Sequence, residues 1–140
     1  MRLLFGHDKV VADWASKKFG YSLRNWHVAV GIIDNSGALV GAASFHDFNE
    51  SNIELCFYGP RSLTKPIVRD LMRFVFTTLG VNRVTAKTPR GNKIVIRGLP
   101  KLGFRMEGVM RRYYGRTKRY DAIVFGLLKN DAERYMGVMQ

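Results

Sequence analysis

The segment from Arg111 to Tyr120 alternates cations with aromatic residues, and this composition suggests a ligand. Cations neutralise phosphate groups and aromatic rings stack on unpaired bases, so the combination is typical of surfaces that bind nucleic acid. The candidate nucleic-acid-binding residues are the cations of this segment: Arg111, Arg112, Arg116, Lys118 and Arg119. Gly115 and its polar neighbours also fit a hairpin loop between two strands, so the segment has either a binding role or a structural one.

The excess positive charge of the chain gathers around this segment. The chain has 23 Lys and Arg, 11 Asp and Glu and a formal net charge of +12, and residues 61–120 hold 16 of the cations beside only Asp70 and Glu107. Closely spaced like charges repel one another, and an anionic partner relieves that repulsion. We therefore expect this half to contact a polyanion, a phosphate-bearing cofactor or a strongly acidic partner. The alternative is a generally basic, solvated surface.

Two further groups have side chains that are capable of chemistry. His46 and Asp47 suggest a catalytic pair, because an imidazole titrates near neutral pH and a carboxylate can orient it. Neighbours on a strand point to opposite faces, however, so we expect His46 to make a local hydrogen bond instead. Cys56 lies in an apolar run and is predicted to be a small core residue.

Length and composition restrict the class of protein. The chain has 140 residues, 46% of them hydrophobic, and a single cysteine. No apolar run approaches the roughly 18 to 20 residues that a bilayer span needs, and the start lacks the apolar core of a secretory signal. An internal disulfide is excluded, and no Cys or His pair has the spacing of metal ligands. We expect one domain over residues 1–140, located in the cytoplasm, with no metal and no membrane contact.

Apolar spacing predicts the elements of the first half. Apolar residues three and four apart indicate a helix, and two apolar runs on either side of the turn signal Asp34-Asn-Ser-Gly37 indicate an antiparallel hairpin. A third strand completes a meander. The expected elements are a helix from His7 or Asp8 to about Phe19, and strands over Val28–Ile33, Ala38–Phe45 and Ile53–Tyr58.

At the start of the second half of the chain, the spacing of apolar residues changes from every second residue to about every 3.6 residues. An apolar stripe over Thr64–Leu79 predicts a long helix, with Thr64 as its N-cap and Gly80 as its end. The remaining expected elements are a short strand over Arg83–Lys87, a helix over Asn92–Leu99 stopped by Pro100, and an antiparallel pair over Phe104–Tyr113 and Tyr120–Leu128. This order predicts a mixed α/β layer architecture with helices packed on a central sheet.

Residues 92–108, which read NKIVIRGLPKLGFRMEG, resemble the second half of the GNAT superfamily of N-acetyltransferases. In that family an Asn opens a helix that runs into Leu-Gly-Phe, and a strand then starts near Glu-Gly; the spacing from Asn92 to Gly103 matches. The resemblance implies an α+β fold with a mixed, mostly antiparallel central sheet of about six strands flanked by helices. The segment Arg61–Pro66 is also similar to small GNAT-like proteins of bacteriophages and prophages, which implies a bacterial host or a phage-infected cell.

The same resemblance implies a site for acetyl-CoA where the third strand turns into the long helix, at Gly59–Lys65. The glycines of the family's loop are missing here, which narrows the backbone cradle, but hydroxyls and cations in the loop offset that loss. We expect a retained but modified cofactor site; alternatively, Thr64 is only a helix cap and the cations are only solvated. The residues implied to contact acetyl-CoA are Phe57, Tyr58, Arg61, Ser62, Leu63, Thr64, Lys65 and Asn92.

Catalytic roles also follow from the resemblance. Many relatives place a tyrosine, the acid that protonates the departing thiolate, where this chain has Leu99, which cannot donate a proton. Tyr113 is the candidate acid in its place, or Tyr114, if the closing strands bring either near. Glu54 is the candidate base; it is alternatively an exposed strand residue beside a cation.

The resulting expectation is an acetyl-CoA-dependent N-acetyltransferase that works by direct transfer in a ternary complex. The basic loop borders the acceptor entrance in the family, so it favours an amine acceptor that is acidic or linked to nucleic acid. The alternative is a non-catalytic GNAT-fold module that holds nucleic acid or another protein, and both a monomer and a homodimer fit. Separation of the strands that bear Phe57 and Lys87 would admit a pantetheine arm, whereas a continuous ladder there would favour the non-catalytic alternative.

Overall fold

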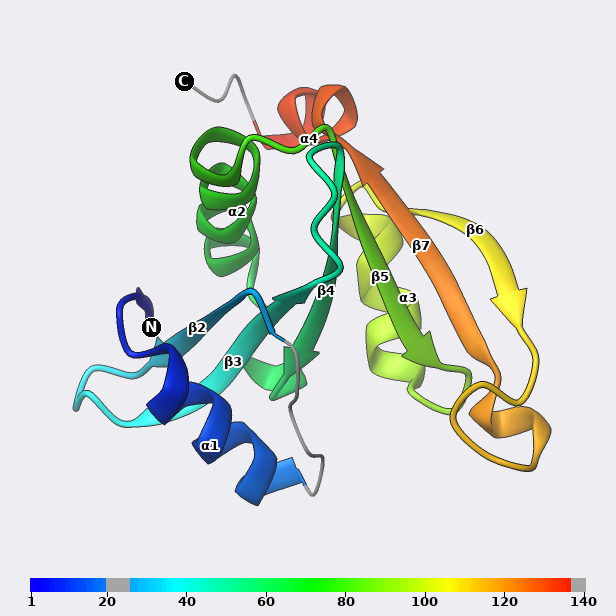
Figure 1. The fold of residues 1–140 in the computed structure, drawn as a ribbon, viewed down its shortest axis with the longest axis horizontal. Coiled ribbons are helices and arrows are strands. Elements are labelled where there is room, and N and C mark those ends of the chain that lie inside the picture. Colours follow the sequence, from blue (N-terminus) through cyan, green and yellow to red (C-terminus); the bar gives the residue numbers. More distant parts are fainter. Residues whose placement is uncertain (20–25, 137–140) are drawn as a thin grey trace.

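The computed structural model describes residues 1–19 and 26–136, which form a seven-stranded sheet with helices on both faces (Figure 1). The strands lie in the order β1-β2-β3-β4-β5-β7-β6. The β4–β5 pair is parallel, and the other neighbouring pairs in this order are antiparallel. The strands are β1 (Arg2–Leu4), β2 (Val28–Ile33), β3 (Leu39–His46), β4 (Asn52–Tyr58), β5 (Arg83–Pro89), β6 (Arg105–Met110) and β7 (Ala122–Leu128).

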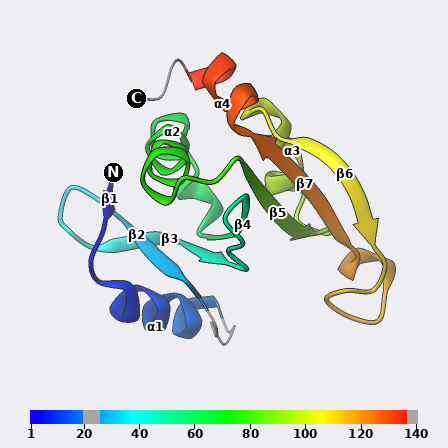
Figure 2. The ribbon, with the colours of Figure 1, turned by 45° about the horizontal axis from the view of Figure 1, so that its top comes forward.

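Helices cover both sides of this sheet. Figure 2 shows α1 and α2 on opposite sides of the part of the sheet that β2 and β3 form. The helices are α1 (Asp8–Phe19), α2 (Lys65–Arg73), α3 (Lys93–Lys101) and α4 (Lys129–Met136). A π-helical segment, Phe74–Leu79, continues α2, and short 3-10 turns occupy Pro60–Ser62 and Lys118–Tyr120. The mixed α+β architecture expected from the sequence is confirmed.

The core lies between α2 and the middle of the sheet. The apolar stripe of α2 buries Ile67, Val68, Leu71 and Met72 against strand residues such as Phe45. Removing an apolar side chain of this size from water contributes roughly 1.5–3 kcal/mol. A smaller cluster packs α1 on the other face, where Ala29 and Ala42 are buried. Packing against both faces fixes the positions of β3 and β4, which carry much of the site described below.

Local sequence signals explain the ends of several elements. The Asp34 carboxylate accepts hydrogen bonds from the backbone N–H groups of Ser36 and Ala38, and this closes the β2–β3 hairpin. Thr64 is the N-cap of α2, although its side chain makes no capping hydrogen bond. Gly80 ends the following π-helical segment with φ +74°, and its N–H donates to the Val75 carbonyl at 3.1 Å. A residue with positive φ is most easily supplied by glycine.

The structure differs from the expected elements in three places. Pro100 does not stop the helix predicted over Asn92–Leu99 but lies inside the last turn of α3, where the missing N–H removes one hydrogen bond close to the frayed end of the helix. The sheet has seven strands rather than about six, because β1 is a three-residue strand with too few residues to show a period. The helix α4, which follows β7 directly, was also not predicted.

Candidate functional site

The pairing between strands β4 and β5 ends halfway along their length. Their parallel pairing runs from Asn52↔Arg83 to Leu55↔Ala86, and it ends there. Residues 56–58 of β4 stay paired with β3, and residues 87–89 of β5 stay paired with β7, so each strand keeps its outer neighbour. Figure 1 shows the resulting V between the two strands. Backbone polar groups on the facing edges are thus left for a ligand that carries amides.

A polar network ties the two strands together at the closed end of this V. The guanidinium of Arg83 donates to Asn52 Oδ1 at 3.0 Å and to the Glu107 carboxylate at 2.8 and 3.1 Å, and Thr85 Oγ1 donates to Asn52 Oδ1 at 2.7 Å. The hydrogen bond from Arg83 lowers the pKa of Glu107. Because the network fixes one end, the opening at the other end has a defined position.

A cavity of about 520 Å³ occupies the open end of the V. Successive residues of β4, from Leu55 to Tyr58, line it, so the cavity extends along the edge of β4 that β5 leaves unpaired. On the α2 and α3 side its walls are apolar. The side chains there include Leu63, Val68, Leu71, Met72, Val95, Leu99, Leu102 and Phe104. An extended, mostly apolar ligand with a few amide groups fits such a passage.

Part of the predicted cofactor set meets at this cavity. Phe57, Tyr58, Leu63 and Asn92 line it, and Asn92 also caps α3. The side chains of Arg61 and Lys65 are exposed at the turn that leads into α2. These positions agree with a ligand that enters between the strands and reaches the start of α2.

Ser62 does not present its hydroxyl group to the cavity. It is only 3% exposed, and its Oγ donates to the Gly59 carbonyl at 2.6 Å. Its side chain packs against Gly41 of β3, so closely that a Cβ at Gly41 would collide with Ser62 Oγ. The hydroxyl therefore holds the turn together and is not a donor to a ligand.

Some backbone N–H groups of this turn already donate to carbonyl groups within the turn. The N–H of Ser62 donates to the Gly59 carbonyl and that of Thr64 donates to the Ser62 carbonyl, each at 2.9 Å. Pro66, in the first turn of α2, has no N–H to offer. A pyrophosphate here would meet fewer main-chain donors than an ordinary helix start supplies. The exposed cations Arg61 and Lys65 would have to supply the positive charge that the backbone does not.

The two predicted catalytic residues come together around a lysine. Lys87 Nζ lies 3.0 Å from Glu54 Oε1, and the two side chains are only 19% and 14% exposed. The same ammonium lies 5.3 Å from the centre of the Tyr113 ring. Glu54, Lys87 and Tyr113 thus form one contiguous group, which we call the acidic-basic cluster. Lys87 is also the first residue of β5 beyond the last strand pair, at the point where the strands separate, which we call the apex of the V. Of the three residues, Lys87 lines the cavity, whereas Glu54 and Tyr113 are not among its lining residues.

Burial and charge set the protonation of the groups at this apex. Burial alone pulls the pKa of Lys87 down, but the hydrogen bond and the charge of Glu54 outweigh it, so the pKa is raised and the ammonium is held charged. Burial, helped by the charge of Glu54, raises the pKa of the Cys56 thiol to about 11. At neutral pH this cysteine stays a thiol and is a poor nucleophile.

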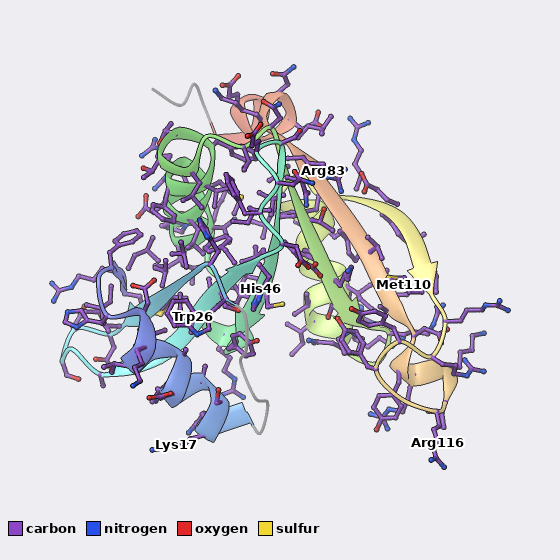
Figure 3. All side chains as sticks on the ribbon, in the orientation of Figure 1. Lys17, Trp26, His46, Arg83, Met110 and Arg116 are labelled. Carbon is purple, nitrogen blue, oxygen red and sulfur yellow. The ribbon has the colours of Figure 1, made fainter. Side chains whose placement is uncertain are left out.

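His46 lies beside the cluster. It pairs with Glu54 across the β3–β4 ladder, and its Nε2 shares a hydrogen bond of 2.8 Å with Ser44 Oγ. The local hydrogen bond expected from the sequence is therefore confirmed. Figure 3 shows His46 near the middle of the molecule, on the strand that borders β4.

The basic segment forms the loop between β6 and β7, next to the cavity. All five of its predicted nucleic-acid-binding cations are exposed, and Figure 3 shows Arg116 pointing away from the rest of the molecule. Arg112 differs, because its guanidinium binds the buried carboxylate of Asp121 at 2.9 Å. Tyr114 and Tyr120 of the same loop line the cavity. The other four exposed cations are Arg111, Arg116, Lys118 and Arg119.

Lys87 is the residue of the cluster that the sequence did not indicate as functional. A lysine between an alanine and a threonine in a short strand gives no signal of its own, because its role depends on its neighbour across a parallel pair. The period of 2 in β5 did place Lys87 on one face with Arg83 and Thr85. The register that brings it to Glu54 comes only from the fold.

The described residues show neither a membrane-spanning helix nor a metal-binding cluster. None of the helices among them is long and apolar enough to cross a membrane. Nowhere in the described ranges do three or more His, Cys, Asp or Glu residues gather in a way that could hold a metal ion.

Solved structures with the same fold include several acetyltransferases. A chimera of the Vibrio cholerae spermidine N-acetyltransferase SpeG and hSSAT superposes with a TM-score of 0.65 at 17% identity, covering 75% of this chain and 69% of that one. Mutant forms of the spermidine/spermine N-acetyltransferase SpeG from Vibrio cholerae give 0.65 at 18% identity over 85% and 75%. An acetyltransferase of the GNAT family from Bacillus anthracis gives 0.57 at 21% identity over 73% and 66%.

Sequence comparison identifies the family. No curated protein matches the sequence. The family described as "Acetyltransferase (GNAT) domain" matches residues 5–105, which is well over half of the chain. Membership of this family implies the use of an acyl-CoA in general terms. The gap between β4 and β5 and the cavity at its open end are consistent with this match. The chain belongs to the GNAT family of acetyltransferases.

Proposed function

We propose that this protein transfers an acetyl group from acetyl-CoA to the amine of an acceptor by direct transfer in a ternary complex. The observation that carries the proposal is the end of strand pairing at Leu55 and Ala86, with a cavity of about 520 Å³ beyond it. The pantetheine arm would lie between the strands and satisfy the backbone groups that face the gap. Phe57, Tyr58, Leu63 and Asn92 would contact it.

Acetyl-CoA supplies an acetyl group activated as a thioester. Glu54 accepts the proton that the acceptor ammonium must lose, and Tyr113 protonates the departing thiolate. Both belong to the acidic-basic cluster at the apex of the V. The neutral thiol of Cys56 argues against an acyl-cysteine intermediate and so supports direct transfer. Leu99, which stands where many relatives have a tyrosine, is 5% exposed and contributes only an apolar wall.

The basic loop indicates the charge of the acceptor. Arg111, Arg116, Lys118 and Arg119 are exposed beside a cavity that Tyr114 and Tyr120 line. Spermidine, on which the SpeG proteins act by name, is a polycation, and these side chains repel it. We infer that the acceptor carries negative charge, for example as a nucleic-acid-linked amine.

A cavity-filling variant tests the proposal. Val95→Trp places an indole in the wall of the cavity, whereas Ile94→Trp, one residue earlier on α3, adds the same group to a side chain that is 67% exposed. We expect calorimetry to show acetyl-CoA binding to the wild type and to Ile94→Trp, and a loss of at least about tenfold in affinity for Val95→Trp. No heat with the wild type at millimolar acetyl-CoA would contradict the proposal.

A second candidate is a non-catalytic module that holds nucleic acid through the basic loop. It is favoured by the four exposed cations beside the exposed aromatic rings of Tyr113 and Tyr114. The cavity-filling variant separates the two functions, because Val95 lies in α3 and not in the loop. Nucleic-acid binding that survives in Val95→Trp, with no acetyl transfer by the wild type, would favour the second candidate.

A further inference from the structure

We propose that Lys87 determines which acceptors react, by masking Glu54 until an acceptor that carries its own anionic group displaces that carboxylate. The substrate class is an amine bearing a carboxylate or a phosphate within reach of Lys87. This inference rests on the proposed acetyl transfer, and it names the residue that selects the acceptor.

The first observation is the state of the predicted base. Glu54 Oε1 lies 3.0 Å from Lys87 Nζ, and both side chains are largely buried. A carboxylate held by a buried ammonium is already neutralised, so it attracts an incoming ammonium group weakly. Deprotonation of an acceptor therefore requires Glu54 to be released. Releasing it without another anion would leave the partly buried ammonium of Lys87 without a counter-charge, which is unfavourable.

The second observation is the position of Lys87. It is the first residue of β5 beyond the last strand pair, and its side chain lines the cavity. The ring of Tyr113 lies 5.3 Å from the ammonium, on the side of the basic loop. A group entering between this loop and the strands therefore comes close to the ammonium at the apex of the V.

The third observation is the balance of charge around Lys87 and the basic loop. Asp121, 3% exposed, binds the guanidinium groups of Arg112 and Arg90 at 2.9 and 3.5 Å. Asp47, whose charge also acts on Lys87, is exposed just beyond the end of β3. Exposed cations of the loop outnumber these acids. A polycationic acceptor thus meets repulsion at this entrance, and an anionic one meets attraction.

An exchange of partners accounts for all three observations. The anionic group of the acceptor takes the place of Glu54 on Lys87, so the ammonium is never left unpaired. The released carboxylate of Glu54 then accepts one proton from the acceptor ammonium, and the nitrogen lone pair becomes available for the thioester. No covalent bond to the protein forms or breaks in this exchange.

The test uses three amines that share one pentamethylene chain and differ only at the far end: cadaverine, ε-aminocaproate and aminopentyl phosphate. With the wild type we expect kcat/KM for at least one of the two anionic amines to exceed that for cadaverine at least about tenfold. The carboxylate and phosphate arms show which anion is preferred. In Lys87→Met we expect the value for that anionic amine to fall at least about tenfold and the value for cadaverine to rise.

Controls separate charge selection from damage to the fold. Lys101→Met removes one exposed cation at the far end of α3 and should leave the preference unchanged. Lys87→Arg keeps a cation and should keep the preference for anionic amines, even if Lys87→Met unfolds. Thermal unfolding of each variant reports its folding.

The outcomes distinguish this inference from the function on which it rests. Absence of acetyl-CoA binding to the wild type overturns both. A wild type that binds acetyl-CoA but prefers cadaverine, or acetylates none of the three amines, overturns the role of Lys87 alone. That role is also overturned if Lys87→Met changes the three kcat/KM values by the same factor, or if Lys87→Arg loses the preference for the anionic amines.

Discussion

Asp121 Oδ1 accepts two hydrogen bonds from Arg112, one from the backbone N–H at 2.8 Å and one from the guanidinium at 2.9 Å. These residues stand at the two ends of the basic loop, and Arg112 has φ +57°. The Asp121 carbonyl also accepts the backbone N–H of Arg90 at 2.8 Å, from the connection between β5 and α3. One aspartate therefore fastens the loop at the mouth of the cavity.

Replacing this carboxylate should loosen the loop in a manner that depends on pH. The backbone hydrogen bond from Arg112 is the main cause that lowers the pKa of Asp121 below its ordinary value of 3.8. A lowered folded pKa means that the stabilisation is complete above the unfolded pKa and is lost as the pH falls through the folded one. We expect Asp121→Asn to unfold at a lower temperature than the wild type at about pH 7, with the difference shrinking below about pH 4.

The control for this measurement is Asp70→Asn, which removes an exposed carboxylate from α2. Its unfolding temperature should stay close to that of the wild type throughout. A difference between Asp121→Asn and the wild type that is equally large at about pH 3 and about pH 7 would contradict the assigned role.

A second prediction concerns the turn between β4 and α2. An alanine at Gly41 would place its Cβ against Ser62 Oγ and 3.0 Å from the Tyr58 carbonyl oxygen, so the turn must move. We expect Gly41→Ala to lower the free energy of unfolding by about 1–3 kcal/mol, as overpacked sites do. Acetyl-CoA affinity, measured by calorimetry, should fall as well, since the same turn leads into the predicted phosphate site.

Gly98 supplies a matched control for that substitution. It lies in α3, and a Cβ there would meet nothing within 4 Å. Gly98→Ala should therefore raise the free energy of unfolding by up to about 1 kcal/mol, because alanine favours a helix more than glycine does. If Gly41→Ala bound acetyl-CoA as tightly as Gly98→Ala, the turn would not be part of the binding site.

A third prediction addresses the closed end of the V. Arg83 and Glu107 pair at 2.8 Å, but their side chains are 28% and 41% exposed, so solvent screens the pair. We expect Glu107→Gln to lower the free energy of unfolding by no more than about 1 kcal/mol. The hydrogen bond from Arg83 lowers the pKa of Glu107 from 4.5, so this contribution is present above that pH and is lost as the pH falls through the lowered value.

Gly126 allows the same pair to be disturbed from the other side. A Cβ at Gly126 would meet the Glu107 carboxylate carbon at 2.6 Å, so Gly126→Ala should push the carboxylate off Arg83. The double variant Glu107→Gln/Gly126→Ala should be less destabilised than the sum of the two single changes. Strict additivity in urea unfolding would show that the two substitutions act separately.

Much of the fold could be predicted because its signals are local. The apolar stripe of α2 shows a helical period by itself, and Asp34 with Gly37 marks the β2–β3 turn. The same kind of signal predicted Gly80 as the end of the helical run that begins with α2, although not the π-helical geometry of its last part, Phe74–Leu79. β1 and the course of α3 through Pro100 were missed, since a short strand has no period and a proline near a helix end costs little.

The candidate site was less accessible to sequence reasoning, because it depends on contacts between distant strands. The predicted residues Phe57, Leu63 and Asn92 do line one cavity. Ser62 was predicted to contact the cofactor through its hydroxyl group. That group instead donates to the Gly59 carbonyl, and the side chain packs against Gly41. The pairing of Glu54 with Lys87 requires the register of a parallel ladder, which the sequence of neither strand contains.

The fourth prediction is that the basic loop binds nucleic acid through phosphate contacts. Each cation that contacts a phosphate releases counterions, so affinity should fall steeply with salt, and removing one such cation should reduce the slope of log affinity against log salt by roughly one unit. We expect Arg116→Ala and Lys118→Ala to weaken binding of tRNA in this way. Lys17 is a suitable control, because it is exposed on α1 and lies far from Arg116 in Figure 3. Lys17→Ala should leave both affinity and slope unchanged. Binding of tRNA that is indifferent to salt, or that weakens equally in Lys17→Ala and Arg116→Ala, would show that the loop does not carry the recognition.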